Sequence, residues 1–96
     1  MNREEVIRRI AEHRSELDQF GVGSLALFGS VARNEATATS DIDILVEFNR
    51  TGGLFDFIRL KHFLEEILGH PVDLVVRDAL KPQLREKIIR ESVHAA

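Results

Sequence analysis

The sequence predicts a small α/β protein in which helices pack on a mixed β-sheet. Segments near both ends repeat apolar residues at helical spacing. Three short apolar runs, at about 23–28, 41–48 and 72–76, have the length and composition of strands. A strongly apolar helical segment separates the second run from the third. Strands and helices therefore alternate in the order α-β-α-β-α-β-α, which is typical of a single sheet covered by helices.

Size and composition favour one soluble domain spanning residues 1–96, with no membrane segment and no secretory signal. The chain has 44% hydrophobic and 30% charged residues, and it has no cysteine that could form a disulfide or a thiolate metal site. These properties suit a cytoplasmic protein. The net charge of −3 argues against nucleic acid as the main partner, because phosphate binding usually needs a positive surplus. Neither composition nor charge indicates the oligomeric state.

The first helix is expected from about Asn2 to Gln19, with Gly21 as its stop. Asn2 can cap its first turn, and Glu5 stands at the capping-box position three residues later. One face of this helix is apolar, formed by Val6, Ile10 and Leu17.

A strand from Gly23 to Phe28 then runs into a Gly29-Ser30 turn. One or two helical turns are expected over 30–34, ended by Asn34, a residue that tolerates the left-handed conformation. The next strand, 41–48, alternates between two faces. Ile42, Ile44 and Val46 point to one face, and Asp41, Asp43 and Leu45 point to the other.

Gly52-Gly53 is expected to break the chain before a helix over 54–68 that Gly69 and Pro71 terminate. The third strand, 72–76, turns Asp73 away from its apolar face. Pro82 suits the first turn of a last helix that runs to about His94. Its buried side is expected to consist of Leu84, Ile88 and Ile89.

The aspartates on two strands indicate a metal site. Asp41 and Asp43 point the same way from one strand, with their Cα atoms roughly 7 Å apart. This leaves room for a hard cation such as Mg²⁺, which binds carboxylates together with substrate phosphates. Asp73, on another strand, can supply a third carboxylate. Three aspartates close together need positive charge between them, because like charges raise one another's pKa.

The Gly29-Ser30 turn is a candidate phosphate site. Glycine lets the backbone approach a phosphate closely, and a serine hydroxyl and the N–H groups at a following helix start can bind its oxygens. Arg33, one turn later, can reach the same phosphates. Each of these pieces taken singly is more often an ordinary loop or a solvated strand end, so the prediction depends on their joint spacing and on the elements that carry them.

Other residues favour structural interpretations. The four histidines, His13, His62, His70 and His94, are scattered without metal-ligand spacing. Arg59 and Lys61 fit the solvated face of a helix. Five phenylalanines are expected in the core rather than on a base-stacking surface: Phe28, Phe48, Phe55, Phe57 and Phe63.

Two segments together resemble the minimal nucleotidyltransferase family of the DNA polymerase beta superfamily. They are Leu27 to Arg33, with the sequence LFGSVAR, and Ser40 to Phe48, with the sequence SDIDILVEF. The Gly-Ser pair, ten intervening residues and Asp-x-Asp form the superfamily signature. The resemblance continues through Gly53 to Asp56, Leu68 to Val75 and Leu80 to Pro82, and so covers nearly the whole chain.

The resemblance implies a nucleotidyltransferase fold and an enzyme that uses ATP and two Mg²⁺ ions. It implies that Asp41 and Asp43 bind both metals, that Asp73 binds the catalytic metal and helps to deprotonate the incoming hydroxyl, and that Gly29 and Ser30 hold the β- and γ-phosphates. Members of this family act as antitoxins of HEPN-domain toxins, some by transferring AMP to a toxin tyrosine. The resemblance therefore also implies a protein partner.

Three departures from the family pattern bear on substrate and partner contacts. Asn34 replaces a common glycine, residues 36–39 replace a more charged stretch, and the end of the chain lacks an aromatic residue. None of the departures removes a predicted metal ligand. Two alternatives to protein adenylylation stay open. One is an antitoxin that binds its toxin stoichiometrically without turnover, and the other is transfer to a small molecule such as an aminoglycoside.

Overall fold

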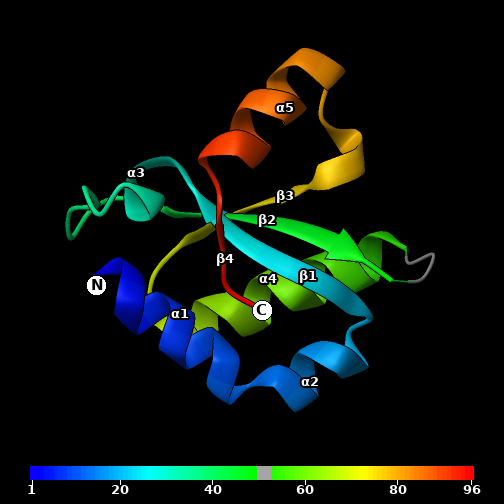
Figure 1. Ribbon diagram of the computed structural model, residues 1–96. Helices are drawn as coiled ribbons and strands as arrows, with labels where there is room; N and C mark the ends of the chain where they lie inside the picture. The colour runs from blue at the N-terminus through cyan, green and yellow to red at the C-terminus, as the bar shows by residue number, and fades with distance from the viewer. Residues whose placement is uncertain (50–52) are drawn as a thin grey trace.

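A four-stranded mixed sheet with helices on both faces forms the molecule (Figure 1), which confirms the predicted fold class. The computed structural model describes residues 1–49 and 53–96. The elements are α1 (Arg3–Glu12), α2 (Arg14–Gln19), β1 (Val22–Phe28), α3 (Gly29–Ala32), β2 (Ile42–Phe48), α4 (Leu54–Leu68), β3 (Val72–Val76), the 3-10 turn η1 (Arg77–Ala79), α5 (Pro82–Glu91) and β4 (Val93–His94).

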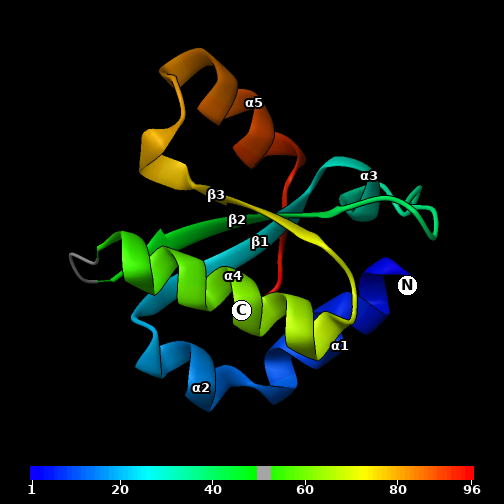
Figure 2. The same cartoon turned by 180° about the vertical axis from the view of Figure 1, so that it is seen from behind.

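The strands follow the order β3-β2-β1-β4. β1 is antiparallel to both of its neighbours, whereas β2 and β3 are parallel. Two parallel strands need a long connection between them. α4 provides this connection on the core face of the sheet, which faces the viewer in Figure 2. The backbone N–H of Ile42 donates to the Pro71 carbonyl at 2.9 Å, which fixes the register where the two strands begin.

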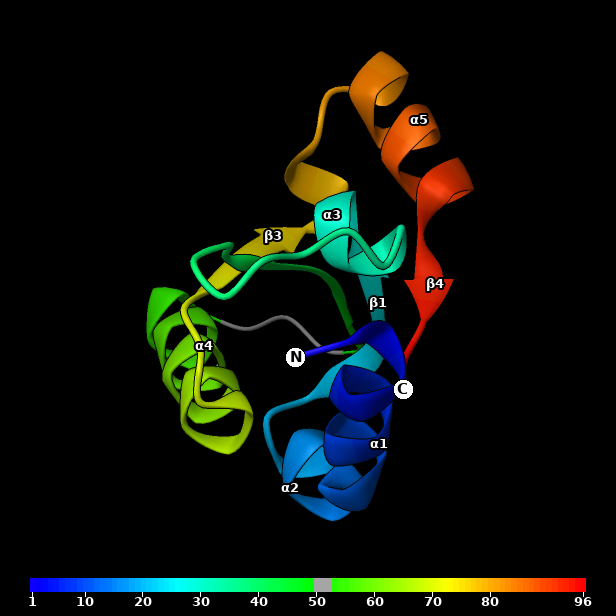
Figure 3. The same ribbon diagram turned by 90° about the vertical axis from the view of Figure 1, so that its left-hand side faces the viewer.

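The core lies between one face of the sheet and the layer of α1, α2 and α4 (Figure 3). The apolar faces predicted for the first helix and for β2 are confirmed, because their residues are at most 3% exposed. Eleven side chains from these elements and from β1 and α3 are completely buried: Val6, Ile10, Leu17, Val22, Leu25, Leu27, Val31, Ile44, Val46, Leu60 and Leu64.

The first helix is not continuous, contrary to the prediction for Asn2 to Gln19. It breaks at His13 into α1 and α2. Nδ1 of His13 lies 2.8 Å from the Arg9 carbonyl, the acceptor that the His13 backbone N–H would use in an unbroken helix. The His13 ring also packs edge-on against Phe63, with ring centres 5.8 Å apart. The predicted cap is present, since the Asn2 side chain accepts from the Glu5 N–H at 2.9 Å.

The last helix ends at Glu91, three residues before the predicted end at His94. Ser92 is extended, and its hydroxyl donates to the Ile89 carbonyl at 2.7 Å, which closes the helix end. The chain then pairs with the free edge of β1 as β4. Ala95 donates to the Leu25 carbonyl at 2.9 Å, so an edge that α5 would leave unpaired is covered by the C-terminal segment.

α5 and η1 lie on the face of the sheet opposite the core layer (Figure 3). No residue of α5 is fully buried, so the buried side predicted for this helix is wrong. Leu84 is 49% exposed, and Ile88 and Ile89 are only half-buried. The helical periodicity of the sequence correctly indicated an apolar stripe on this helix. α5 lies on the face of the sheet opposite the core, however, so this stripe is not enclosed by a second layer of helices.

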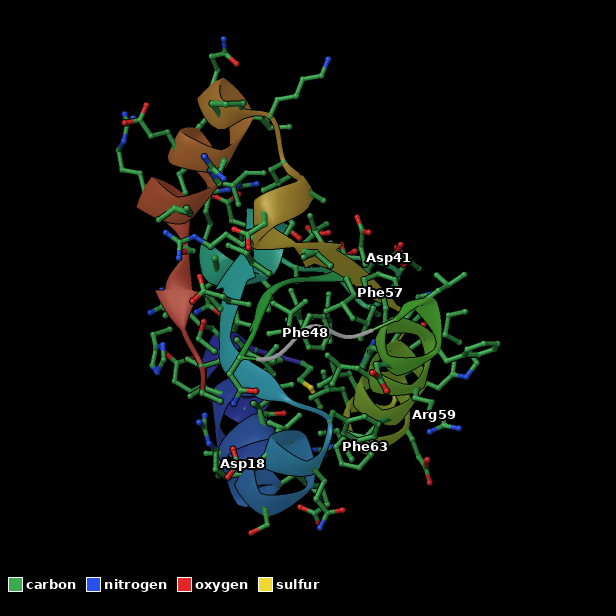
Figure 4. All side chains as sticks on the ribbon, turned by 90° about the vertical axis from the view of Figure 1, so that its right-hand side faces the viewer. Asp18, Asp41, Phe48, Phe57, Arg59 and Phe63 are labelled. Atoms are coloured by element: carbon green, nitrogen blue, oxygen red, sulfur yellow. The ribbon has the colours of Figure 1, made fainter. Side chains whose placement is uncertain are left out.

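The aromatic predictions divide between the core and the surface. Phe48, Phe57 and Phe63 lie on the core side, close to α4 (Figure 4). Phe28 is half-buried at the end of β1. Phe55 is 77% exposed at the start of α4, so its predicted place in the core is wrong. Arg59 points away from the body of the protein (Figure 4), as expected for a solvated helix face.

Glycine marks both ends of α4. Gly53 is its N-cap, whereas Gly52, the other half of the predicted break, lies outside the described residues. Gly69 ends the helix in the left-handed conformation, with φ +67°, as its predicted role as a stop requires. In residues 1–49 and 53–96, no helix combines the length and apolarity needed to cross a membrane.

Two leucines of α4 test where the stability of the fold comes from. Leu64→Ala should lower the free energy of unfolding by about 2–5 kcal/mol, because a completely buried side chain leaves a cavity. Leu54→Ala, at a position that is 70% exposed, should change it by about 0.5 kcal/mol or less. Urea denaturation followed by circular dichroism measures both values. Equal losses in the two variants would contradict this core.

Candidate active site

Asp43 and Asp73 lie directly opposite each other on the parallel strands β2 and β3. Both turn away from the core, because their neighbours along each strand belong to the buried cluster. Their side chains therefore share the face of the sheet that α5 covers in part. The two carboxylates predicted to converge from separate strands are thus adjacent and on the same side.

The environment of Asp43 penalises its negative charge. Burial raises the pKa of Asp43 most, followed by the charge of Asp73 and a hydrogen bond between the two side chains. The charge of Asp41 raises the pKa further, and only Arg33 acts in the opposite direction. The site therefore concentrates negative charge beyond what nearby cationic side chains neutralise, which is the condition under which a bound cation is stabilising.

Asp41 stands one residue before β2 and is exposed (Figure 4). A tight turn precedes it, in which the Thr37 N–H donates to the Ser40 hydroxyl at 3.1 Å and the Ser40 N–H donates to the Thr37 carbonyl at 3.1 Å. Within residues 1–49 and 53–96, no three acidic or imidazole side chains are already gathered closely enough to enclose an ion. Asp43 and Asp73 are adjacent in register, and Asp43 is half-buried, whereas Asp41 and Asp73 are both exposed.

Gly29 is the residue that brings the Gly29-Ser30 turn against Asp43. It follows β1 with φ +67°, a left-handed conformation that favours glycine. A Cβ at this position would collide with Oδ2 of Asp43, so any other residue would require the carboxylate to shift. The backbone of the turn therefore passes directly beside the carboxylate.

Ser30 lies in the single helical turn α3, where the first amides have no acceptor within the helix. The first helix of the chain holds this turn in place. The Arg3 guanidinium donates to the Ala32 carbonyl at 3.0 Å, and the Arg3 N–H donates to the Asn34 side chain at 3.3 Å. Asn34 has φ 60°, so it ends the turn in the left-handed conformation as predicted.

Arg33 is exposed at the end of α3, and its Nε pairs with the Glu35 carboxylate at 3.1 Å. Burial is the main reason that the pKa of Asp43 is raised, and the positive charge of Arg33 acts against that rise. In this arrangement Arg33 is already tied to an acidic neighbour. To meet a phosphate it has to exchange that solvent-exposed pair, which costs little.

Two polar contacts near the site were not anticipated. Glu47 and Arg77 form an ion pair on the face that carries the two aspartates. Each stands four residues after one of the register partners, Asp43 and Asp73, so the pairing follows from a register that the sequence does not reveal. On the far side, Glu65 of α4 accepts from the Val72 N–H at 3.0 Å and holds the start of β3.

The chain belongs to a known family, as comparisons with other proteins establish. The family model for a nucleotidyltransferase domain matches residues 7–95. A Methanocaldococcus jannaschii protein assigned as a protein adenylyltransferase is 45% identical over 93 residues, covering 97% of each chain. The protein adenylyltransferase MntA of Thermococcus cleftensis is 41% identical, with 95% of this chain and 93% of the relative covered.

Solved structures support the same assignment. A minimal nucleotidyltransferase superposes with a TM-score of 0.86 at 41% identity and covers 97% of this chain and 95% of its own. The Shewanella oneidensis complex of an MNT antitoxin with a tri-AMPylated HEPN toxin gives a TM-score of 0.66 at 21% identity. That match covers 92% of this chain and 69% of the other, and it establishes a common fold alone.

The fold and the sequence signature define an enzyme of the nucleotidyltransferase class. Within this class, the chain belongs to the minimal nucleotidyltransferase family. Its substrate is accordingly a nucleotide.

Two glycines with the same φ separate backbone strain from the contact with Asp43. Gly69→Ala should cost about 1–2 kcal/mol of unfolding free energy, because only the left-handed backbone opposes the new side chain. Gly29→Ala should cost roughly 1–3 kcal/mol more, because its Cβ also collides with the Asp43 carboxylate. Urea denaturation of both variants gives the difference. Equal losses would show that Asp43 moves aside freely.

Asp43 also gives the stability a pH dependence. Its pKa is raised above the ordinary value of 3.8, so the folded chain binds this proton more tightly than the unfolded chain does. The ionised carboxylate therefore costs stability at neutral pH, and the cost is relieved as the pH falls through the raised pKa. Asp43→Asn should consequently raise the unfolding free energy relative to the wild type at pH 7 and raise it less at pH 4.

The measurement is urea denaturation at both pH values in the presence of a chelator, so that no bound cation masks the repulsion. Asp78→Asn, which removes a carboxylate at an exposed position in η1, is the control for the loss of one negative charge. A gain for Asp43→Asn that is the same at pH 4 and pH 7 would contradict the raised pKa.

Proposed function

We propose that residues 1–96 form a single domain that transfers AMP from ATP to a hydroxyl of a partner protein, and that the partner is a HEPN-domain toxin whose activity the transfer suppresses. The observation that carries the proposal is the in-register pair Asp43 and Asp73 beside the left-handed Gly29. Carboxylates and a close-approaching backbone are the two parts that transfer of a nucleotidyl group requires.

The donor atoms fit Mg²⁺. Asp41, Asp43 and Asp73 offer only carboxylate oxygens, which hard cations prefer. Burial, followed by the charge of Asp73, raises the pKa of Asp43, so a cation bound there would be stabilising. In the proposed enzyme, Asp41 and Asp43 hold two Mg²⁺ ions and Asp73 joins the catalytic one. When bound, the ions supply charge neutralisation for the triphosphate and fix its position.

The residues of the phosphate turn bind the part of ATP that leaves. The amides at the start of α3 and the Ser30 hydroxyl donate to the β- and γ-phosphates, and Gly29 lets the backbone come close enough. Arg33 adds positive charge after exchanging its contact with Glu35. Binding here orients the bond between the α- and β-phosphates over the pair of strand aspartates.

Asp73 is the proposed proton acceptor. The attacking hydroxyl oxygen forms a bond to the α-phosphorus while the bridging bond to the β-phosphate breaks, and pyrophosphate leaves with that electron pair. The hydroxyl proton passes to the Asp73 carboxylate. Its neighbour Asp43 lies opposite it in register. In the proposed reaction the acceptor meets the α-phosphate beside these two carboxylates.

Two similar proteins support a protein as the acceptor of AMP. The Thermococcus cleftensis relative, at 41% identity, is a protein adenylyltransferase. In the Shewanella oneidensis complex, the toxin bound to the MNT antitoxin carries AMP. We extend the same role to this chain, with a tyrosine as the proposed acceptor residue, as the family resemblance implies.

The test is to incubate the protein with ATP, Mg²⁺ and the product of the neighbouring gene, followed by intact-mass and peptide mass spectrometry. We expect one or more AMP adducts on a tyrosine of the partner. Asp41→Asn combined with Asp43→Asn should slow adduct formation by at least about a thousandfold, because charge neutralisation at the phosphates is lost.

Toxin activity measured in the same reactions separates catalysis from binding. If the double variant neutralises the partner fully at an equimolar ratio without any adduct, the protein acts as a stoichiometric antitoxin and the transfer proposal is wrong. Adducts on a small molecule such as an aminoglycoside, in place of the partner, would equally contradict a protein acceptor.

A further inference from the structure

The two borders of the sheet differ in how they are covered. At one border the two-residue β4 lies along β1. At the other border, β3 has β2 on its inner side and, within residues 1–49 and 53–96, no strand on its outer side. β3 is five residues long, and its sequence VDLVV contains no proline or lysine that would discourage pairing. An edge of this kind can pair with an extended segment of another protein.

The backbone groups that face outward from β3 follow from its register with β2. The Pro71 carbonyl faces β2, because it accepts from the Ile42 N–H at 2.9 Å. The backbone groups of successive residues in a strand point to alternate sides, so those of Asp73 also face β2. Those of Leu74 and Val76 therefore face outward, away from the sheet.

Two features mark the ends of this outward-facing stretch. At the start of β3, the Val72 N–H already donates to the Glu65 carboxylate at 3.0 Å, which also confirms that Val72 faces outward. At the other end, the chain turns into η1 at Arg77. Leu74 and Val76 lie between these limits, and they can bond a short extended segment.

Asp73 places this edge beside the candidate active site. Its side chain is exposed, and it shares the face of the sheet with Asp43. Its backbone groups face inward, so an antiparallel strand added outside β3 would form a non-hydrogen-bonded pair at this position. The Cα atoms of such a pair are about 4.5 Å apart, and the two side chains stand on one face. The added residue would therefore lie next to the Asp73 carboxylate.

We propose that an extended segment of the acceptor protein adds to the outer edge of β3 and sets the residue with the attacking hydroxyl opposite Asp73. This inference rests on the proposed function. Hydrogen bonds to the outward groups of Leu74 and Val76 hold the segment in register. The hydroxyl then approaches over the face that carries Asp43 and Asp73, where the α-phosphate is expected.

Charge favours a different protein over a second copy of this chain. In β3 and η1, Asp73 and Asp78 are acidic. The basic Arg77 is already paired with Glu47. Two copies that paired through β3 would bring these acidic stretches together, and like charges on opposing strands are destabilising. The chain also has no tyrosine, so another copy cannot present the proposed acceptor residue. A segment with a lysine or arginine beside its tyrosine complements the edge.

Val76→Pro tests the edge without changing a site residue. Val76 has φ −82°, close to the value that proline imposes, and its N–H does not face β2. The change should raise the apparent KM for the partner, the product of the neighbouring gene, at least about fivefold, because a hydrogen bond is lost and the ring obstructs the edge. The KM for ATP should stay unchanged. Mass spectrometry of AMP adducts gives the rates.

Val76→Ala is the matched control, because it removes the same side chain but keeps the N–H. It should retain the wild-type KM for the partner, and circular dichroism of both variants checks their folding. Equal KM values for the partner in the two folded variants would overturn docking at this edge. If the wild type forms no adduct at all, the proposed function is wrong and this inference falls with it.

Amide hydrogen exchange followed by NMR tests the register in the unmodified chain. Without ATP, the Leu74 and Val76 amides should exchange rapidly in the free protein and slow at least about tenfold when the partner is bound. The Asp73 amide faces β2, so it should be protected in both states. A Leu74 amide that stays unprotected in the complex would contradict the added strand, whatever the proline variant shows.

Discussion

The parallel pairing of β2 with β3 is the constraint on which the rest of the molecule depends. It sets Asp43 opposite Asp73, and the same register continues to the Glu47–Arg77 ion pair at the other end of the strands. A slip of one residue would turn one member of each pair into the core. α4 makes this register possible by crossing behind the sheet, and its Glu65 binds the first amide of β3.

The same register that builds the site also costs stability. Burial raises the pKa of Asp43 most, and repulsion from the neighbouring Asp73 carboxylate raises it further. A sheet face designed only for stability would place opposite charges or apolar residues there. The core on the other face compensates, because it contains eleven completely buried side chains from six elements. One face of the sheet therefore carries the core that stabilises the fold, and the other face carries the candidate site.

Several elements surround the carboxylates on the same face of the sheet. Gly29 brings backbone amides against Asp43, and Arg3 of the first helix holds the turn that carries them. On the other side, η1 and α5 enclose a pocket next to Arg77. α5 buries none of its side chains fully, so its contribution to the core is small.

Local pattern predicted most of the helices and strands and placed Asp43 and Asp73 on the face of the sheet away from the core. Strand alternation separated Asp43 and Asp73 from the apolar faces, and glycines marked the turn at Gly29 and the helix end at Gly69. Pattern failed where a distant partner decided the outcome. The edge of β1 recruited the last residues as a strand instead of helix, and Phe63 packs against His13 where the first helix breaks. Only the tertiary structure fixed the β2–β3 register and the α5 pocket, because both depend on contacts between segments far apart in the chain.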